Sequence, residues 1–160
     1  MIVVADASPL RYLALIGVEE VIPALYGNVL IPPAVLRELT QPGTPEKVRL
    51  WIGAQPGWLR LRIPLSAADF PSVLGPGESE AIALAKEVDA ALLLIDDWAG
   101  RREATRRNLS VQGTLGTLSL AADHNLLDLP SAIARLQETN FRATPSLIRA
   151  ALGQHFNPRS

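Results

Sequence analysis

Two short runs of apolar residues end directly in aspartate, and they dominate the pattern of the chain. One run covers residues 92–95 before Asp96 and Asp97, and the other covers residues 2–5 before Asp6. A short continuous apolar run predicts a strand that is buried on both faces, as in a parallel sheet. Ligands bind beyond the carboxyl ends of such strands in open α/β sheets. The three aspartates are therefore predicted to lie at the ligand-binding edge.

Strand and helix patterns alternate along the rest of the chain. Residues 29–31 and residue 111 predict two further short strands, and residues 58–63 alternate like a half-exposed edge strand. Helical spacing predicts helices at residues 10–16, 34–39, 46–53, 77–88, 101–107, 113–122, 130–139 and 145–152. No linker or repeat divides the chain, so we expect one domain over residues 1–160. The predicted fold is a three-layer α/β/α sandwich around a central, mostly parallel sheet.

The composition is typical of a globular domain without thiol chemistry. Of the 160 residues 48% are hydrophobic and 19% charged, and cysteine is absent. The formal net charge of −1 argues against a general nucleic-acid coat protein, but not against an enzyme with a local basic patch. No apolar run is long enough to span a bilayer, and the first run lacks the basic flank of a signal peptide. We therefore expect a cytoplasmic protein without a membrane segment.

Carboxylates from four regions are candidates for the same edge of the sheet. They are Asp6, Glu38, Glu78 with Glu80, and Asp96 with Asp97. Glu78 and Glu80 open a helix, which brings them to this edge only if that helix runs antiparallel to a neighbouring strand. Clustered carboxylates suit Mg²⁺ or Mn²⁺, which prefer oxygen ligands, and such an ion can activate water for phosphodiester hydrolysis.

Each acid by itself also has a simpler structural interpretation. Glu78 and Glu80 stand where acids favour the helix dipole, and Glu38 alone reads as a solvated helix residue. Asp6 and Asp97 both precede helices and can act as N-caps. The hypothesis of a metal site therefore rests on the combination of acids.

Six short motifs follow one another over nearly the whole chain. They are VADASPL (residues 4–10), IPPAVLREL (31–39), GESEAIALA (77–85), LIDD (94–97), GTLG (113–116) and FRAT (141–144). In this order they resemble PIN-domain proteins, the ribonuclease fold used by VapC-like toxins of toxin–antitoxin pairs. The chain looks closest to a stand-alone prokaryotic branch of that family.

The resemblance implies a Mg²⁺- or Mn²⁺-dependent endoribonuclease that cuts single-stranded RNA. The family acids would be Asp6, Glu38, then Glu78 or Glu80, and finally Asp96 or Asp97. The family spacing favours Glu78 with Asp96, 18 residues apart, slightly over Glu80 with Asp97, 17 apart. Glutamate at the third position departs from the usual aspartate. Ser8 would match a small hydroxyl that hydrogen-bonds within the acidic site.

Basic and aromatic residues follow the acidic strand directly. Arg101 and Arg102 are candidates for holding flanking phosphates, together with Arg106 and Arg107. The alternative is an ordinary solvated helix face, with Glu103 paired to Arg107. Trp98 is a candidate for stacking on a base, although we expect it to pack against the protein.

Rival functions and further partners complete the sequence-based hypotheses. A PIN fold without turnover, acting as a nucleic-acid- or protein-binding module, is the main alternative. A receiver-type phosphotransfer switch needs a late lysine, and no lysine follows Asp97; a haloacid-dehalogenase-like phosphatase needs aspartate where Ser8 stands. The resemblance also implies a small antitoxin as partner. The apolar C-terminal helices offer a homodimer surface, with core packing as the default.

Overall fold

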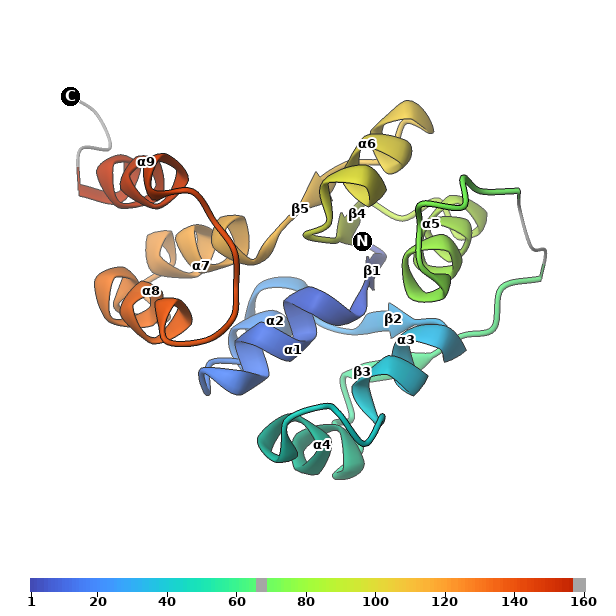
Figure 1. Cartoon of the computed structure of the whole chain (residues 1–160), viewed down its shortest axis with the longest axis horizontal. Helices are drawn as coiled ribbons and strands as arrows, with labels where there is room; N and C mark the ends of the chain where they lie inside the picture. Colours follow the sequence, from blue (N-terminus) through green and yellow to red (C-terminus); the bar gives the residue numbers. More distant parts are fainter. Residues whose placement is uncertain (66–68, 157–160) are drawn as a thin grey trace.

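The computed structural model describes residues 1–65 and 69–156 and has a five-stranded sheet at its centre (Figure 1). The strands are β1 (Val3–Ala5), β2 (Val29–Ile31), β3 (Leu59–Leu61), β4 (Leu92–Leu94) and β5 (Val111–Gln112). Their order is β3-β2-β1-β4-β5, and every pairing between these described strands is parallel. The predicted α/β fold with a parallel sheet is thus confirmed. The predicted single domain extends over residues 66–68 and 157–160, which lie outside the described residues.

The apolar runs of β1 and β4 form the middle of the core. Val3, Val4, Leu93 and Leu94 are completely buried, as is Ile95 just after β4. Both strands lie between two neighbouring strands, and helices cover both of their faces. The side chains of β1 and β4 therefore point into the interior, which explains why the two runs are continuously apolar and do not alternate with polar residues. The edge strand β3 is more exposed than its alternation predicts: Leu59 is half-buried, but Leu61 is exposed like Arg60.

Helices connect the strands and cover both faces of the sheet. Those described are α1 (Ala7–Leu15), α2 (Val21–Tyr26), α3 (Pro33–Leu39), α4 (Glu46–Gly53), α5 (Pro76–Glu87), α6 (Trp98–Arg106), α7 (Thr114–Asp123), α8 (Leu129–Gln137) and α9 (Pro145–Phe156). Helix α2 was not predicted from the sequence, since it is only six residues long and contains Pro23. Helix α6 begins three residues earlier than predicted, because the Asp97 side chain already caps this helix at Trp98.

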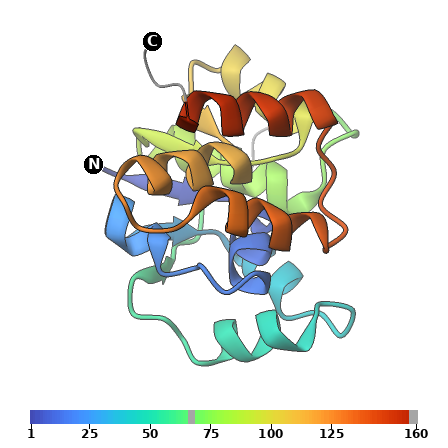
Figure 2. The ribbon, with the colours of Figure 1, turned by 90° about the vertical axis from the view of Figure 1, so that its left-hand side faces the viewer.

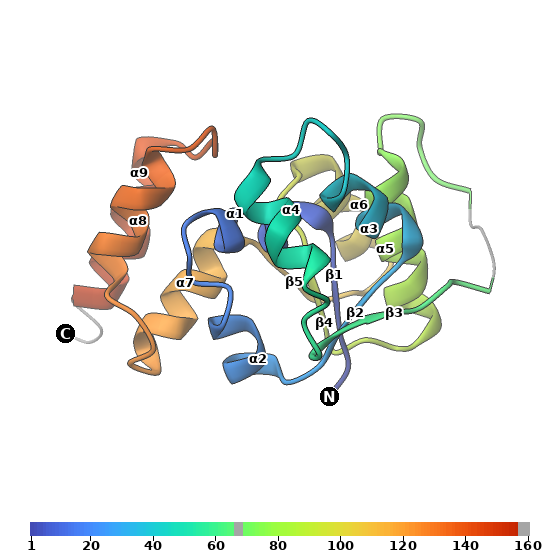
Figure 3. The same ribbon diagram turned by 90° about the horizontal axis from the view of Figure 1, so that it is seen from below.

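The helices form unequal layers around the sheet. Helix α5 packs against β1 and β4, and Figure 3 shows α1, α2 and α7 on the opposite side of these strands. Helices α7, α8 and α9 pack against one another and lie side by side in Figure 2. The apolar side chains of α8, including Leu129, Ile133 and Leu136, are buried in the core. Core packing therefore accounts for these three residues. None of the described helices is long and apolar enough to cross a membrane.

Candidate active site

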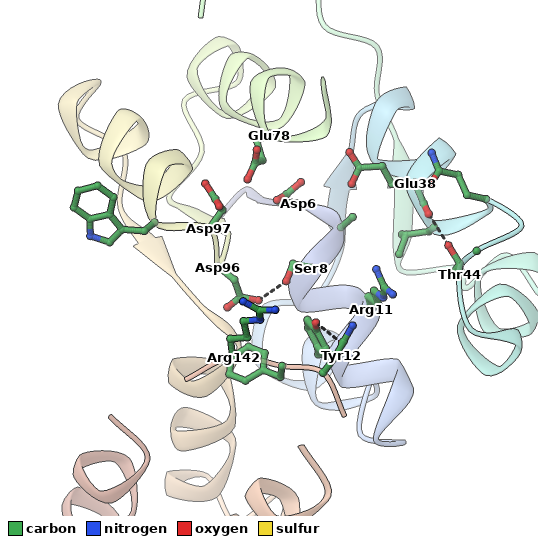
Figure 4. Close-up of a pocket in the computed structure, with 17 residues that line it drawn as sticks. Asp6, Ser8, Arg11, Tyr12, Glu38, Thr44, Glu78, Asp96, Asp97 and Arg142 are labelled. Atoms are coloured by element: carbon green, nitrogen blue, oxygen red, sulfur yellow. Dashed lines mark hydrogen bonds between the residues drawn. The ribbon is translucent and has the colours of Figure 1, made fainter. Parts of the chain in front are cut away.

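A polar cleft opens where the strand order reverses, at the carboxyl ends of β1 and β4. Ala5 pairs with Leu94 in the sheet, and the Asp6 amide donates a hydrogen bond of 2.8 Å to the Leu94 carbonyl. Such a switch point is where open α/β sheets bind ligands. The cleft measures about 1000 Å³, the upper end of the range for small-molecule pockets. Its charged lining residues are Asp6, Arg11, Glu38, Glu78, Asp96, Asp97 and Arg142 (Figure 4).

Asp6 is the most deeply buried acid of the cleft. Only 4% of its surface is exposed, and its Oδ1 atom has no hydrogen-bond partner among the described residues. The pKa of Asp6 is raised from 3.8 to about 7, and burial is the largest cause. A backbone hydrogen bond at Ala7 opposes the rise, and the charges of Glu38, Glu78 and Asp96 contribute to it. A buried carboxylate oxygen that lacks a donor is a natural contact for a cation.

Asp96 is held rigidly by three hydrogen bonds from two other elements. Its Oδ1 atom accepts from the Thr114 amide at 2.7 Å. Its Oδ2 atom accepts from the Thr114 hydroxyl at 2.7 Å and from the Ser8 hydroxyl at 2.8 Å. Asp96 therefore joins the end of β4 to the starts of α1 and α7. Thr114 lies within the GTLG motif, but no role for it was predicted from the sequence.

Glu78 and Asp97 lie close together on the α5–α6 side of the cleft (Figure 4). The Glu78 Oε1 atom accepts from the Gly75 amide at 2.7 Å and so helps to cap α5. The Asp97 Oδ2 atom accepts from the Gly100 amide at 2.9 Å and caps α6, as the structural interpretation predicted. Burial raises the pKa of Glu78, and the neighbouring Asp97 charge raises it further. Helix α5 thus begins at the ligand-binding edge, as it must if it runs antiparallel to the neighbouring strands.

Glu38 faces these acids from α3. Its Oε1 atom accepts from the Gly77 amide at 3.2 Å, and burial raises its pKa although this bond and the charge of Arg11 oppose the change. A Cβ atom on Gly77 would overlap the Glu38 carboxylate. The absence of a side chain at Gly77 therefore allows the carboxylate to reach the α5 backbone.

Glu80 lies outside the cleft, in contrast to the other predicted acids. Its Oε1 atom accepts from the Ala34 amide at 3.0 Å at the start of α3, and its Oε2 atom lies 3.7 Å from the Arg37 guanidinium. These contacts turn Glu80 toward α3, so Glu78 is the α5 acid that the geometry brings to the site.

The predicted basic residues on α6 divide into two groups. Arg106 and Arg107 contact Glu103 at 2.8 and 2.7 Å, so the predicted pair of Glu103 with Arg107 is confirmed. Arg102 lies over the Trp98 ring, 5.0 Å from its centroid. The expectation that Trp98 packs against the protein was wrong, because 70% of this residue is exposed. A Cβ on Gly113 would lie within 3 Å of both Arg101 Nη1 and Asp96 Oδ1, which places Arg101 beside the site.

The far wall of the cleft comes from residues that sequence reasoning missed. The loop between α8 and α9 brings Arg142 to the cleft, near Asp96 in Figure 4. Tyr12 on α1 fixes this loop, because its hydroxyl donates to Asn140 Oδ1 at 2.7 Å and its ring meets Phe141 edge-on at 5.0 Å. The FRAT motif was the one signal for this loop. Nothing in the periodicity of α1 points to a contact some 130 residues away.

The donor set fits a hard divalent cation that keeps part of its water shell. In the part of the chain that the structure describes, no group of three acids is arranged as a ready-made metal site. Mg²⁺ is commonly held by one or two carboxylates, with waters and substrate phosphates completing its octahedron. The unpaired Asp6 oxygen and the carboxylate-only ligands match this mode of binding, and cysteine is absent.

Comparisons with known proteins agree with this fold. The DUF3368 family model, described as a PIN domain, matches residues 2–156, so the chain belongs to the PIN-domain family. PIN domains are typically nucleases and generally use divalent metals. A solved structure of a PilT N-terminus domain protein, SSO1118 from the archaeon Sulfolobus solfataricus P2, shares the fold with a TM-score of 0.52 and 17% identity. That match covers 90% of this chain and 100% of the other. No curated protein matches the chain.

Proposed function

We infer that the protein is a divalent-metal-dependent endoribonuclease that cuts single-stranded RNA in this cleft. The observation that carries the proposal is the pair Asp6 and Asp96 on neighbouring strand ends, with one buried Asp6 oxygen left without a hydrogen-bond donor. Membership of the PIN family supports a nuclease, and the open cleft supports a strand that can bend into it.

The acids that line the cleft, Asp6, Glu38, Glu78 and Asp96 with Asp97 beside them, are the candidate ligands of Mg²⁺ or Mn²⁺. One or two of these carboxylates would hold the ion, and its waters would complete the shell. When bound, the ion supplies positive charge that activates water and neutralises the phosphate. Ser8 and Thr114 fix the Asp96 carboxylate through its three hydrogen bonds.

Side chains of the cleft can also move protons and bind phosphate. Glu78, where it does not itself hold the ion, would accept a proton of the attacking water. In the hydrolysis, the water oxygen bonds to phosphorus, the bond to the 3′ oxygen breaks, and that oxygen takes up a proton. Arg11 and Arg142 line the cleft together with the acids and would contact the phosphates on either side.

The direct test is the cleavage of a single-stranded RNA with Mg²⁺ or Mn²⁺ and with a chelator. We expect metal-dependent cutting that leaves 5′-phosphate and 3′-hydroxyl ends, also when the 2′-hydroxyl at the cut is removed. Cutting that persists in chelator, or ends that carry a cyclic phosphate, would contradict the proposal because both indicate attack by the RNA itself.

Substitution of Gly77 by alanine is expected to lower the cleavage rate about tenfold, because the new methyl group displaces the Glu38 carboxylate. Thermal stability should change little, since the obstructed atoms are the end of a flexible side chain. The matched control is Gly53→Ala on α4, where a Cβ meets nothing within 4 Å. Equal rates for the two variants would show that the position of Glu38 does not matter.

Removal of the Arg142 side chain is expected to weaken RNA binding about three- to tenfold at low salt. The slope of log Kd against the logarithm of the salt concentration should also fall by about one, because one phosphate contact is lost. Arg149→Ala, an exposed arginine on α9, is the control and should retain the full slope. An unchanged slope in Arg142→Ala would remove Arg142 from the substrate path.

A binding module without turnover is the second candidate. The observation that favours it is that Glu38 and Glu78 each already accept a backbone hydrogen bond, which competes with metal coordination. Such a protein would bind RNA without cutting it under any metal. If it is the toxin of a pair, a small antitoxin would cover the same acidic cleft.

A further inference from the structure

Trp98 is exposed in a way that the other tryptophans are not. Trp51 and Trp58 are partly buried against the core and pack on each other with ring centroids 5.9 Å apart. Trp98, by contrast, is 70% exposed. An aromatic side chain stabilises a fold mainly through its buried area, so an exposed indole contributes little to stability. The ring is therefore available to a ligand.

The position of Trp98 connects the acidic cleft to a second groove. Trp98 follows Asp97 directly at the start of α6 and lines the acidic cleft. It also lines a smaller groove of about 260 Å³. That groove runs between α6 and the segment before α5, which contributes Pro71, Val73 and Leu74. A strand leaving the cleft on this side would pass over the indole ring.

Charge along the second groove suits a nucleic-acid strand. Arg102 lies over one face of the Trp98 ring and forms no ion pair with a described residue. Glu103, the acid of this groove, is buried and engaged by Arg106 and Arg107. Arg102 thus keeps its positive charge available and holds the ring in place through a cation–π contact.

We propose that Trp98 and Arg102 form a base-stacking subsite for the nucleotide that leaves the acidic cleft along α6. The base would stack on the Trp98 face opposite Arg102, and the guanidinium would contact the adjoining phosphate. Such stacking accepts any base, because every base has a π-face. This inference rests on the proposed function, since it takes single-stranded RNA as the occupant of the cleft.

The test measures binding separately from cleavage. Anisotropy of a fluorescein-labelled single-stranded RNA is titrated with the Asp96→Asn protein, carrying in addition Trp98→Ala, Trp98→Phe or Leu50→Ala. Leu50 is 68% exposed on α4, away from the cleft, and serves as the matched control. We expect about a tenfold loss of affinity for Trp98→Ala and at most about a twofold loss for Trp98→Phe. Leu50→Ala should bind like the parent.

A series of RNAs with one abasic nucleotide locates the subsite. One position should weaken binding to the parent, and at that position Trp98→Ala should cause no further loss. Equal affinities of the parent and Trp98→Ala would overturn the subsite, as would a loss that is the same at every abasic position. Wild-type protein that binds RNA with this Trp98 dependence but never cuts it would refute the ribonuclease and leave the subsite standing.

Discussion

Replacement of Asp6 by asparagine should stabilise the metal-free protein at pH 8 by about 2–4 kcal/mol. The folded-state pKa of Asp6 is about 7, against 3.8 as the ordinary value. Each unit of difference corresponds to about 1.4 kcal/mol. Because the folded-state pKa is the higher one, the folded protein holds a proton that the unfolded chain releases. This contribution is fully present below about pH 4 and is lost as the pH rises toward 7. Asparagine cannot ionise, so the variant does not lose this stability as the pH rises.

Urea unfolding of both proteins between pH 4 and pH 8, in chelator, measures this effect. The stability advantage of Asp6→Asn over wild type should be near zero at pH 4, should grow between pH 4 and pH 7, and should level off toward pH 8. The control is Asp89→Asn: Asp89 is exposed, with a positive φ of 53° that asparagine tolerates. Parallel stability curves for wild type and Asp6→Asn would show that Asp6 carries no buried charge.

Replacement of Asp96 by asparagine should lower the rate of RNA cleavage about a hundredfold or more and should preserve the fold. The asparagine oxygen can still accept from the Thr114 amide, and the hydroxyls of Ser8 and Thr114 can rotate to accept from its NH₂ group. The negative charge that would hold a cation is nevertheless lost. Cleavage assays with Mn²⁺ and melting curves measure the two effects.

Asp96→Ala provides the contrast. It removes all three hydrogen bonds and should cost about 2–3 kcal/mol of stability in addition to the activity. If Asp96→Asn cuts RNA like wild type, Asp96 is a purely structural residue that ties α7 to the sheet.

The sequence predicted the centre of the fold because its signals there are local. An apolar run ending in aspartate predicts a buried strand with an acid at its carboxyl end, and this placed Asp6 and Asp96 correctly at one edge. The structural role of Asp97 as a cap was equally local. Between Glu78 and Glu80 the pattern could not decide, because both lie within the first turns of α5. The choice depends on α3, whose amide at Ala34 binds Glu80.

Other parts of the site depend on contacts that no local pattern contains. Arg142 reaches the cleft only because Tyr12 on α1 binds the loop after α8. The exposure of Trp98 follows from where α6 begins and from the orientation of that helix, not from the residue type. The three hydrogen bonds that fix Asp96 likewise join residues 18 and 88 positions apart.

Metal-dependent cleavage of single-stranded RNA by wild type, Asp6→Asn and Asp89→Asn tests the central claim most directly. We expect wild type and Asp89→Asn to cut equally in Mg²⁺ or Mn²⁺ and to stop cutting in chelator. Asp6→Asn should be inactive although it is the more stable protein, so unfolding could not explain its inactivity. Cutting by Asp6→Asn at the wild-type rate would contradict the claim that the acids at the ends of β1 and β4 form the active site.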